Sequence, residues 1–247
     1  MTRLAISVVL LCVPLLMAPN VIQGTGAPAG WTTISDNFNR ADSTNLGSDW
    51  NEANGDWEIE SNQVDNNVSG AQSGSVIWVT DQVNARHYGC IVNVTGGNTH
   101  GGIKLRVQET ADTSDSYVVR WQSTNFVQAR HCNGTSCSTF GGNQSHTIHS
   151  GDDLCAEVRY TGVDTEFLLW DSPTDTTDRD SWGDADYCWC DSATCAHSDC
   201  NCAGSTTCVD GEPGSGNYSD CGSGCYLGFY TGSGTTLAMD DFEAGWQ

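Results

Sequence analysis

The chain has 247 residues, and 31 acidic side chains against 9 Lys and Arg give it a formal charge of −22. A general nucleic-acid binder needs surplus cations to displace the counterions of the phosphates, so this composition excludes that class and confines any polyanionic partner to a local basic patch. Beyond the first twenty residues no apolar run is long enough to cross a bilayer, which excludes an internal membrane span.

The first residues have the pattern of a secretory signal peptide. Arg3 provides the charged start, and the apolar run that follows, residues 4–17, is too short for a convincing membrane span. We expect residues 1–24 to be removed, which predicts a secreted, extracellular protein without membrane contact. The alternative is that the segment is retained as an N-terminal anchor. Loss of Cys12 leaves 12 of the 13 cysteines, and an even number in a secreted chain predicts disulfides.

Short runs with an apolar residue at every second position, separated by Gly, Asn, Asp and Ser, fill most of the remaining chain. Such strands at regular spacing predict an antiparallel β-sandwich, and no segment keeps a helical period for three turns. The predicted strands are residues 57–60, 75–79, 88–94, 102–108, 116–122, 126–132, 154–160, 166–170, 225–231 and 237–243. The residues expected to face the core are Trp57, Leu105, Val119, Trp121, Val158, Leu168 and Phe229.

Residues 173–224 interrupt this strand pattern. The stretch has too few apolar side chains for a core of its own, so we interpret it as a loop insertion held by disulfides. We expect two groups of cysteines that do not mix. In the sandwich, Cys132 and Cys137 flank a short turn that can bring them within bridging distance, which leaves Cys90 for Cys155. The other group consists of Cys188, Cys190, Cys195, Cys200, Cys202, Cys208, Cys221 and Cys225.

Several segments, in the right order, resemble concanavalin A-like (laminin G-like) jelly-roll domains of secreted bacterial and phage proteins. The opening strands are similar at 36–42 and 55–59, the paired central strands at 101–106 and 116–121, and a closing strand at 240–242. The resemblance implies an all-β, two-sheet antiparallel jelly-roll sandwich over 31–247 with the Cys-rich insertion inside it. That superfamily contains lectins, carbohydrate-binding modules, adhesion domains, glycoside hydrolases and polysaccharide lyases, so fold alone does not fix the function.

Two signatures of the superfamily's enzymes are missing from the chain. It has no Glu-x-Asp-x-x-Glu strand, which places acid and nucleophile on one face in family 16 glycoside hydrolases, and no Arg-x-Glu-x-Arg strand like that of jelly-roll alginate lyases. The sequence therefore favours a binding module over an enzyme. If the chain does cleave glycans, the first residues to test are Glu109, Glu157 and His131.

Strand alternation places basic and amide side chains on the face opposite the core. The residues of this predicted stripe are Lys104, Arg106, Arg120, Gln122 and Arg130, with Gln128 on the same face if the register holds. A basic stripe on an acidic protein suits a carboxylated or sulfated glycan, because guanidinium groups bind carboxylates with two hydrogen bonds. The alternative is that these cations pair with Asp and Glu side chains on a solvated face.

Trp182, Tyr187 and Trp189 lie in the insertion, where no core is nearby. Flat aromatic side chains on a rigid loop can stack on sugar rings, so we interpret these three as ligand-binding residues. The alternative is that they pack the insertion against the sandwich.

Two further patterns predict a metal site and glycosylation. Asp178, Asp180, Asp184 and Asp186 bring together the oxygen ligands that Ca²⁺ requires, with a solvated acidic loop as the alternative. Five Asn-x-Ser/Thr sequons predict glycosylation in a host that glycosylates secreted proteins. They lie at Asn67, Asn93, Asn133, Asn143 and Asn217.

The leading hypothesis is a secreted, lectin-like module that binds a carbohydrate or glycoconjugate, in particular an acidic polysaccharide. A second hypothesis is a structural subunit of an extracellular coat, filament or adhesin, which would self-assemble. A third is a glycan-cleaving hydrolase or lyase. No nucleic-acid partner is expected, and Ca²⁺ is the one cofactor that the sequence suggests.

Overall fold

The computed structural model describes residues 30–66, 75–78, 86–93, 100–108, 116–122, 126–133, 136–139, 143–160, 165–173, 182, 185–190, 207–210, 225–231 and 238–247. This part of the chain is all-β and contains no helix. Among these residues, then, no helix is long and apolar enough to span a membrane. The predicted signal peptide, residues 1–24, lies outside the described residues.

The first of two sheets, sheet 1, has nine strands. Their bounds are β1 (Thr32–Asp36), β3 (Trp57–Glu60), β4 (Gln63–Asn66), β6 (Arg86–Asn93), β12 (Asp152–Tyr160), β13 (Thr165–Asp171), β14 (Tyr187–Cys190), β15 (Thr207–Asp210) and β17 (Ala238–Trp246). The order across the sheet is β15-β14-β13-β12-β6-β17-β4-β3, and β1 also pairs with β17. Strands β14 and β15 are parallel, whereas β12 is antiparallel to both of its neighbours.

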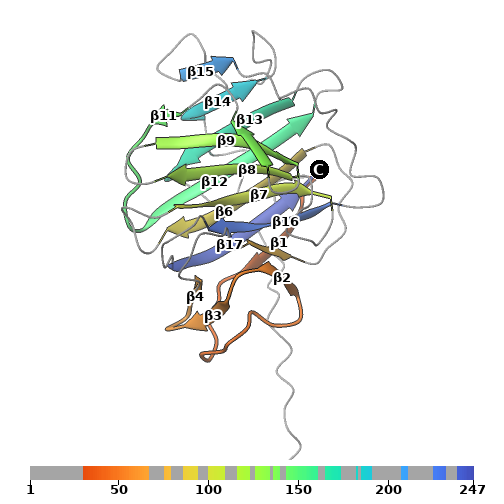
Figure 1. Ribbon diagram of the computed structural model, residues 1–247, viewed down its shortest axis with the longest axis vertical. Coiled ribbons are helices and arrows are strands. Elements are labelled where there is room, and N and C mark those ends of the chain that lie inside the picture. Colours follow the sequence, from red (N-terminus) through yellow and green to blue (C-terminus); the bar gives the residue numbers. More distant parts are fainter. Residues whose placement is uncertain are drawn as a thin grey trace, which may run out of the picture.

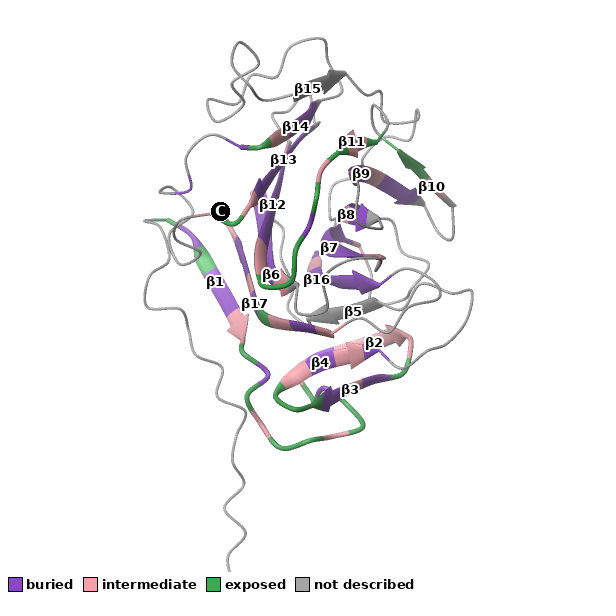
Figure 2. Ribbon diagram, turned by 90° about the vertical axis from the view of Figure 1, so that its left-hand side faces the viewer, coloured by how far each residue is buried: buried purple, intermediate pink, exposed green. Residues whose placement is uncertain are grey.

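The second sheet, sheet 2, has eight strands. Their bounds are β2 (Trp50–Asn54), β5 (Ser75–Trp78), β7 (His100–Val107), β8 (Ser116–Gln122), β9 (Phe126–Asn133), β10 (Ser136–Thr139), β11 (Gln144–Ser145) and β16 (Tyr226–Thr231). The order is β10-β9-β8-β7-β16-β5-β2, and β11 pairs with β9. The two sheets lie face to face (Figure 1), and the chain between β11 and β12 passes from one sheet to the other (Figure 2). The predicted two-sheet sandwich is therefore confirmed.

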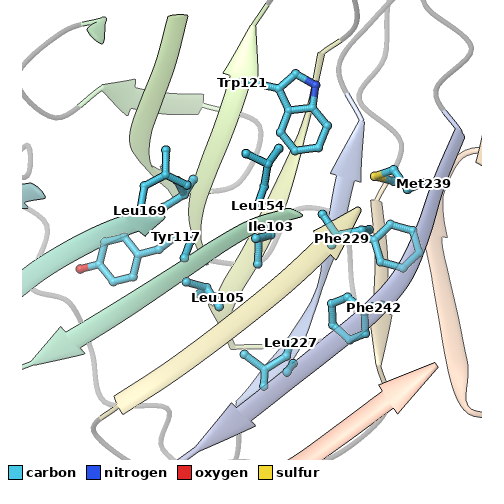
Figure 3. Close-up of a cluster of buried hydrophobic side chains, with 14 of the residues drawn as sticks. Ile103, Leu105, Tyr117, Trp121, Leu154, Leu169, Leu227, Phe229, Met239 and Phe242 are labelled. Carbon is cyan, nitrogen blue, oxygen red and sulfur yellow. The ribbon is translucent and has the colours of Figure 1, made fainter. Parts of the chain in front are cut away.

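The core lies between the sheets and follows from the alternation of the strands. Ile103 and Leu105 of β7 meet Leu154 of β12 and Leu169 of β13 in one buried cluster, together with Phe229 of β16 (Figure 3). Six of the seven residues expected to face the core belong to this cluster, and these are Trp57, Leu105, Val119, Trp121, Val158 and Phe229.

Leu168 is the exception, because it lies on the outer face of sheet 1. There it is buried with Trp170 and Trp182, while Phe167 and Leu169 on either side of it face the core. The run Phe167–Trp170 is apolar throughout, so the sequence carries no alternation from which the phase of β13 could be read. Both faces of this strand are buried, which explains why the expectation for Leu168 was wrong.

The insertion contributes two strands to sheet 1. Strand β14 pairs with β13 over four residues, and β15 then pairs with β14. The insertion is thus anchored by backbone hydrogen bonds as well as by disulfides. Other strands that the sequence did not predict are β1, β2, β4, β10 and β11, which are short and largely polar.

Two predicted disulfides are present in the sandwich. Cys132 bonds to Cys137 across the short turn, and Cys90 bonds to Cys155, 65 residues further along the chain. These bonds use all four sandwich cysteines, so the expected separation of the two cysteine groups is confirmed. Cys188 and Cys225 are also disulfide-bonded.

We expect Trp182→Ala to unfold more easily than the wild-type protein. The Trp182 ring, 6% exposed, makes edge contacts at 5.0 Å with Trp170 and 5.5 Å with Tyr88 on the outer face of sheet 1. Truncation of a buried tryptophan costs about 3–5 kcal/mol of unfolding free energy, measured by chemical denaturation, and Trp182→Phe should retain part of it. A Trp182→Ala protein as stable as the wild type would contradict this packing role.

Candidate functional site

The outer face of sheet 2 brings basic side chains from neighbouring strands into register. Arg120 of β8 pairs with Gln128 of β9, and one row further along Lys104 of β7 and Arg130 of β9 flank Val118 of β8. Ile103, Val119 and Ala129 alternate with these residues and are buried in the core. We call His100, Lys104, Arg120, Gln128 and Arg130 together the basic face.

Arg120 is the centre of the basic face. His100, Lys104 and Arg130 are each its diagonal cross-strand neighbour, because Arg120 pairs with Gly102 on one side and Gln128 on the other. Diagonal neighbours on one face of a sheet are about 7–8 Å apart at the backbone. Long cationic side chains at that spacing can reach a common ligand.

A glycine allows β7 to approach β8 closely at this point. A Cβ atom on Gly102 would lie 2.7 Å from the Cα atom and 2.8 Å from the Cβ atom of Arg120. Even alanine at this position would therefore push the two strands apart and displace Arg120.

The neutral amide of Gln128 bonds to the Arg120 side chain. Its Nε and Nη2 donate hydrogen bonds of 3.0 and 2.8 Å to Oε1 of Gln128. Gln128 is buried and in turn donates through Nε2 to Oδ1 of Asn143, which is exposed. An amide orients a guanidinium without neutralising it, so these two hydrogen bonds do not cancel the charge of Arg120.

The positive charges of the basic face act on one another. Burial and the nearby charge of Arg120 lower the pKa of His100 below its ordinary value. Burial and Arg120 also lower the pKa of Arg130, against an opposing effect of Tyr230. Like charges that disfavour one another are a sign of local positive potential, and an anion placed among them would relieve the repulsion.

Two residues of the predicted stripe are less accessible than expected. Lys104 is 4% exposed and Arg106 3%, although both were predicted to face solvent. Val118 and Tyr230 form a small apolar cluster on the same face as Lys104. Arg106 has a φ angle of 49° and lies where the pairing of β7 with β16 is irregular. Strand alternation predicts neither feature. Lys104 and Arg106 therefore add positive charge beneath the surface but are not open ligand contacts. The side chain of Gln122 lies outside the described residues.

The aromatic side chains of the insertion do not form a stacking surface. Trp189 is fully buried in the core, and Trp182 is buried on the outer face of sheet 1. Tyr187 is half-buried, packs against the core and donates a hydrogen bond to the carbonyl of Ser145. Because β14 joins sheet 1, these rings face the sandwich, and the packing alternative holds in place of ligand binding.

Most of the remaining predicted site residues are outside the described part of the chain. This applies to Asp178, Asp180, Asp184, Glu109, Asn67 and Asn217, and to the side chains of Asn93 and Asn133. Asp186 is exposed and accepts a hydrogen bond of 2.7 Å from the backbone N–H of Asp171. Within the described residues no group of three or more His, Cys, Asp and Glu side chains could hold a metal ion.

Of the residues named for a glycan-cleaving enzyme, the described Glu157 and His131 lie on different sheets. The carboxylate of Glu157 is completely buried and bonds to Nε of Arg86 at 2.7 Å. His131 is buried in contact with the ring of Tyr117, 5.2 Å away. Neither side chain is open to a substrate in this arrangement.

Sequence reasoning missed His100 as part of the basic face and Asn143 as the partner of Gln128. His100 lies four residues before Lys104 on the same strand face, but the predicted strand began at Gly102. Extension of the strand by two residues would have found it. Asn143 was considered for glycosylation alone, since its contact with Gln128 depends on the path of the chain after β10.

A histidine cluster that the sequence did not predict joins the two sheets. His146 Nε2 lies 2.7 Å from Oδ2 of Asp171, and its Nδ1 lies 3.1 Å from the hydroxyl of Tyr187. Burial and the negative charges of Asp186 and Asp171 raise the pKa of Tyr187, so this hydroxyl keeps its proton at neutral pH. The cluster fastens the segment after β11 to sheet 1.

Sheet 1 carries an acidic cluster where β12 and β17 flank Val92 of β6. Burial raises the pKa of Asp153, and the charges of Asp241, Asp152 and Asp171 raise it further. The pKa values of Asp240 and Asp241 are also raised, in both cases mainly by burial. This cluster repels anions, so an anionic ligand is disfavoured on this part of sheet 1.

Comparison with known proteins gives distant structural neighbours and no match in sequence. No known protein family and no curated protein matches its sequence. It is similar to the carbohydrate-binding module CBM66 from Bacillus subtilis (10% identity, 79% of this chain and 93% of that one, TM-score 0.45). It is also similar to a structure described under endo-acting O-glycanases of the human gut microbiota (10% identity, 86% and 98%, TM-score 0.49).

A third similar structure is a lichenase, a β-1,3-1,4-glucanase from a mouse hindgut metagenome (10% identity, 87% of this chain and 99% of that one, TM-score 0.43). These neighbours are thus carbohydrate-binding modules and glycan hydrolases. At TM-scores below 0.5 the likeness does not extend to the ligand or the activity of this chain.

We expect Asp153→Asn to stabilise the protein at pH 7. The folded-state pKa of Asp153 is raised above its ordinary value of 3.8. The carboxyl group therefore stabilises the folded protein fully below about pH 3.8, and this stabilisation is lost as the pH rises through the folded-state pKa. The gain at neutral pH is about 0.5 kcal/mol, because solvent partly screens the group, and it should vanish near pH 3.8. Asp49→Asn removes the same charge outside the cluster and is the control for unfolding measured against pH. A lower stability of Asp153→Asn at pH 7 would contradict the assignment.

Proposed function

We propose that this protein is a secreted carbohydrate-binding module of the concanavalin A-like type, and that it binds acidic polysaccharides on the basic face. The observation that carries the proposal is the setting of Arg120. The amide of Gln128 orients its guanidinium, and Lys104, Arg130 and the titratable His100 are its diagonal neighbours. In a chain of net charge −22, such a cluster is suited to an anionic ligand.

The chemistry of the basic face favours an acidic ligand over a neutral one. Neutral sugars are commonly held by exposed aromatic rings, but Trp182 and Trp189 are buried. Arg120 and Arg130 are half-buried, which strengthens a charge-assisted hydrogen bond to a carboxylate or sulfate relative to one at a fully exposed site. The exposed amide of Asn143 adds a neutral group that can meet the hydroxyl groups of a sugar ring.

Arg120→Gln should weaken binding of an acidic polysaccharide such as polygalacturonate by about tenfold or more, since a hydrogen bond to a charged group contributes about 1.5–3 kcal/mol. Arg159→Gln is the matched control, because Arg159 is half-buried on β12 of sheet 1 and the change removes the same charge. Affinity should also fall as salt is added, because exposed charges are screened over about 8 Å at physiological ionic strength.

Isothermal titration of both variants against polygalacturonate and a neutral β-glucan tests the proposal. Equal losses in Arg120→Gln and Arg159→Gln would contradict the basic face as the site. A wild-type protein that binds no acidic polysaccharide, but forms large assemblies in size-exclusion chromatography, would instead support the hypothesis of a structural subunit.

A further inference from the structure

His100 and Arg120 meet at the end of the basic face where β7 begins and β8 ends. Arg120 pairs with Gly102 of β7, so His100, two residues before Gly102, is its diagonal neighbour. Diagonal neighbours are about 7–8 Å apart at the backbone, so both side chains can reach one anionic group.

His100 is the titratable residue at that end. It is half-buried at the start of β7, one row beyond Arg120 on the same face. The charged and titratable residues of this face on the strands beside it are Arg120 on β8, Arg130 on β9 and Tyr230 on β16, with Lys104 further along β7. Among these described strand residues there is no carboxylate.

We propose that one anionic group of the ligand, a carboxylate or a sulfate ester, binds between His100 and Arg120, and that His100 takes up a proton from solvent as it binds. The inference rests on the proposed function, because it concerns the same face. It adds the occupant of the site, a single anionic group in contact with the side chains of His100 and Arg120, and a dependence of affinity on pH.

The direction of the pH dependence follows from the surroundings of His100. In the free protein, burial and the charge of Arg120 hold the pKa of His100 below 6.5, so its ring is mostly neutral at pH 7. A bound anion stabilises the imidazolium form and raises the pKa of His100. Between the two pKa values binding takes up protons, so affinity increases as the pH falls, by at most tenfold per pH unit for one proton.

Proton uptake can be measured by titrating the full protein with polygalacturonate at pH 6.5 in buffers of different ionisation enthalpy. The dependence of the observed heat on the buffer gives the number of protons taken up. A parallel titration with dextran sulfate distinguishes a sulfate from a carboxylate as the preferred group. Above pH 6 both ligands stay fully charged, so a change in affinity there reports on the protein.

We expect the wild-type protein to take up as much as about one proton per anionic group bound. His100→Gln should take up none, and its affinity should stay flat between pH 6 and 8. His149→Gln is the matched control, because His149 is exposed and lies beside Asp152 at the start of β12, and it should behave as the wild type. His100→Asn and melting curves of both variants exclude a loss of folding as the cause.

Three results would overturn the inference. Binding without proton uptake would remove the role of His100 and leave the proposed function intact, as would uptake that persists in both His100 variants. Absence of binding to either polyanion would overturn the inference together with the proposed function.

Discussion

The register of β7, β8 and β9 is the constraint on which both the core and the basic face depend. Side chains alternate along a strand, so a slip of β8 by one residue would bring Arg120 into the core and Val119 to the outer face. Burial of a side chain such as Val119 stabilises the fold by about 1.5–3 kcal/mol, whereas burial of a guanidinium in an apolar core is costly. The hydrophobic core thereby fixes the positions of the cations on the opposite face.

The arginines of this chain differ in the partners that hold them. Arg86 bonds to the buried carboxylate of Glu157, and Arg40 to Asp36 at 2.6 Å, so these cations offset negative charge within the fold. Arg120 is oriented by the amide of Gln128. This arrangement gathers basic side chains on one face of a chain of net charge −22, which is the reason for proposing an acidic ligand there.

Period-two alternation predicted the central strands and the inward positions of Leu105, Val119 and Trp121, because one face of each strand is apolar. It could not predict the burial of Lys104, which depends on what covers the outer face of the sheet. Nor could it predict the position of Trp182, because the pairing of β14 with β13 joins segments that local sequence does not relate. Short polar strands such as β11 were not predicted for the same reason, because their conformation depends on pairing with a strand elsewhere in the sequence.

Closure of the sandwich and order in the basic face depend on one segment of the chain. This segment starts at Asn143, which accepts the hydrogen bond from Gln128, and reaches His146, which bonds to Asp171 of sheet 1. Ile148 then enters the core before β12 begins. Because Gln128 is the residue that orients Arg120, detachment of His146 from sheet 1 would also loosen the amide chain that holds the guanidinium. The contacts between the two sheets therefore contribute to the preorganisation of the site, which lowers the entropic cost of binding a ligand there.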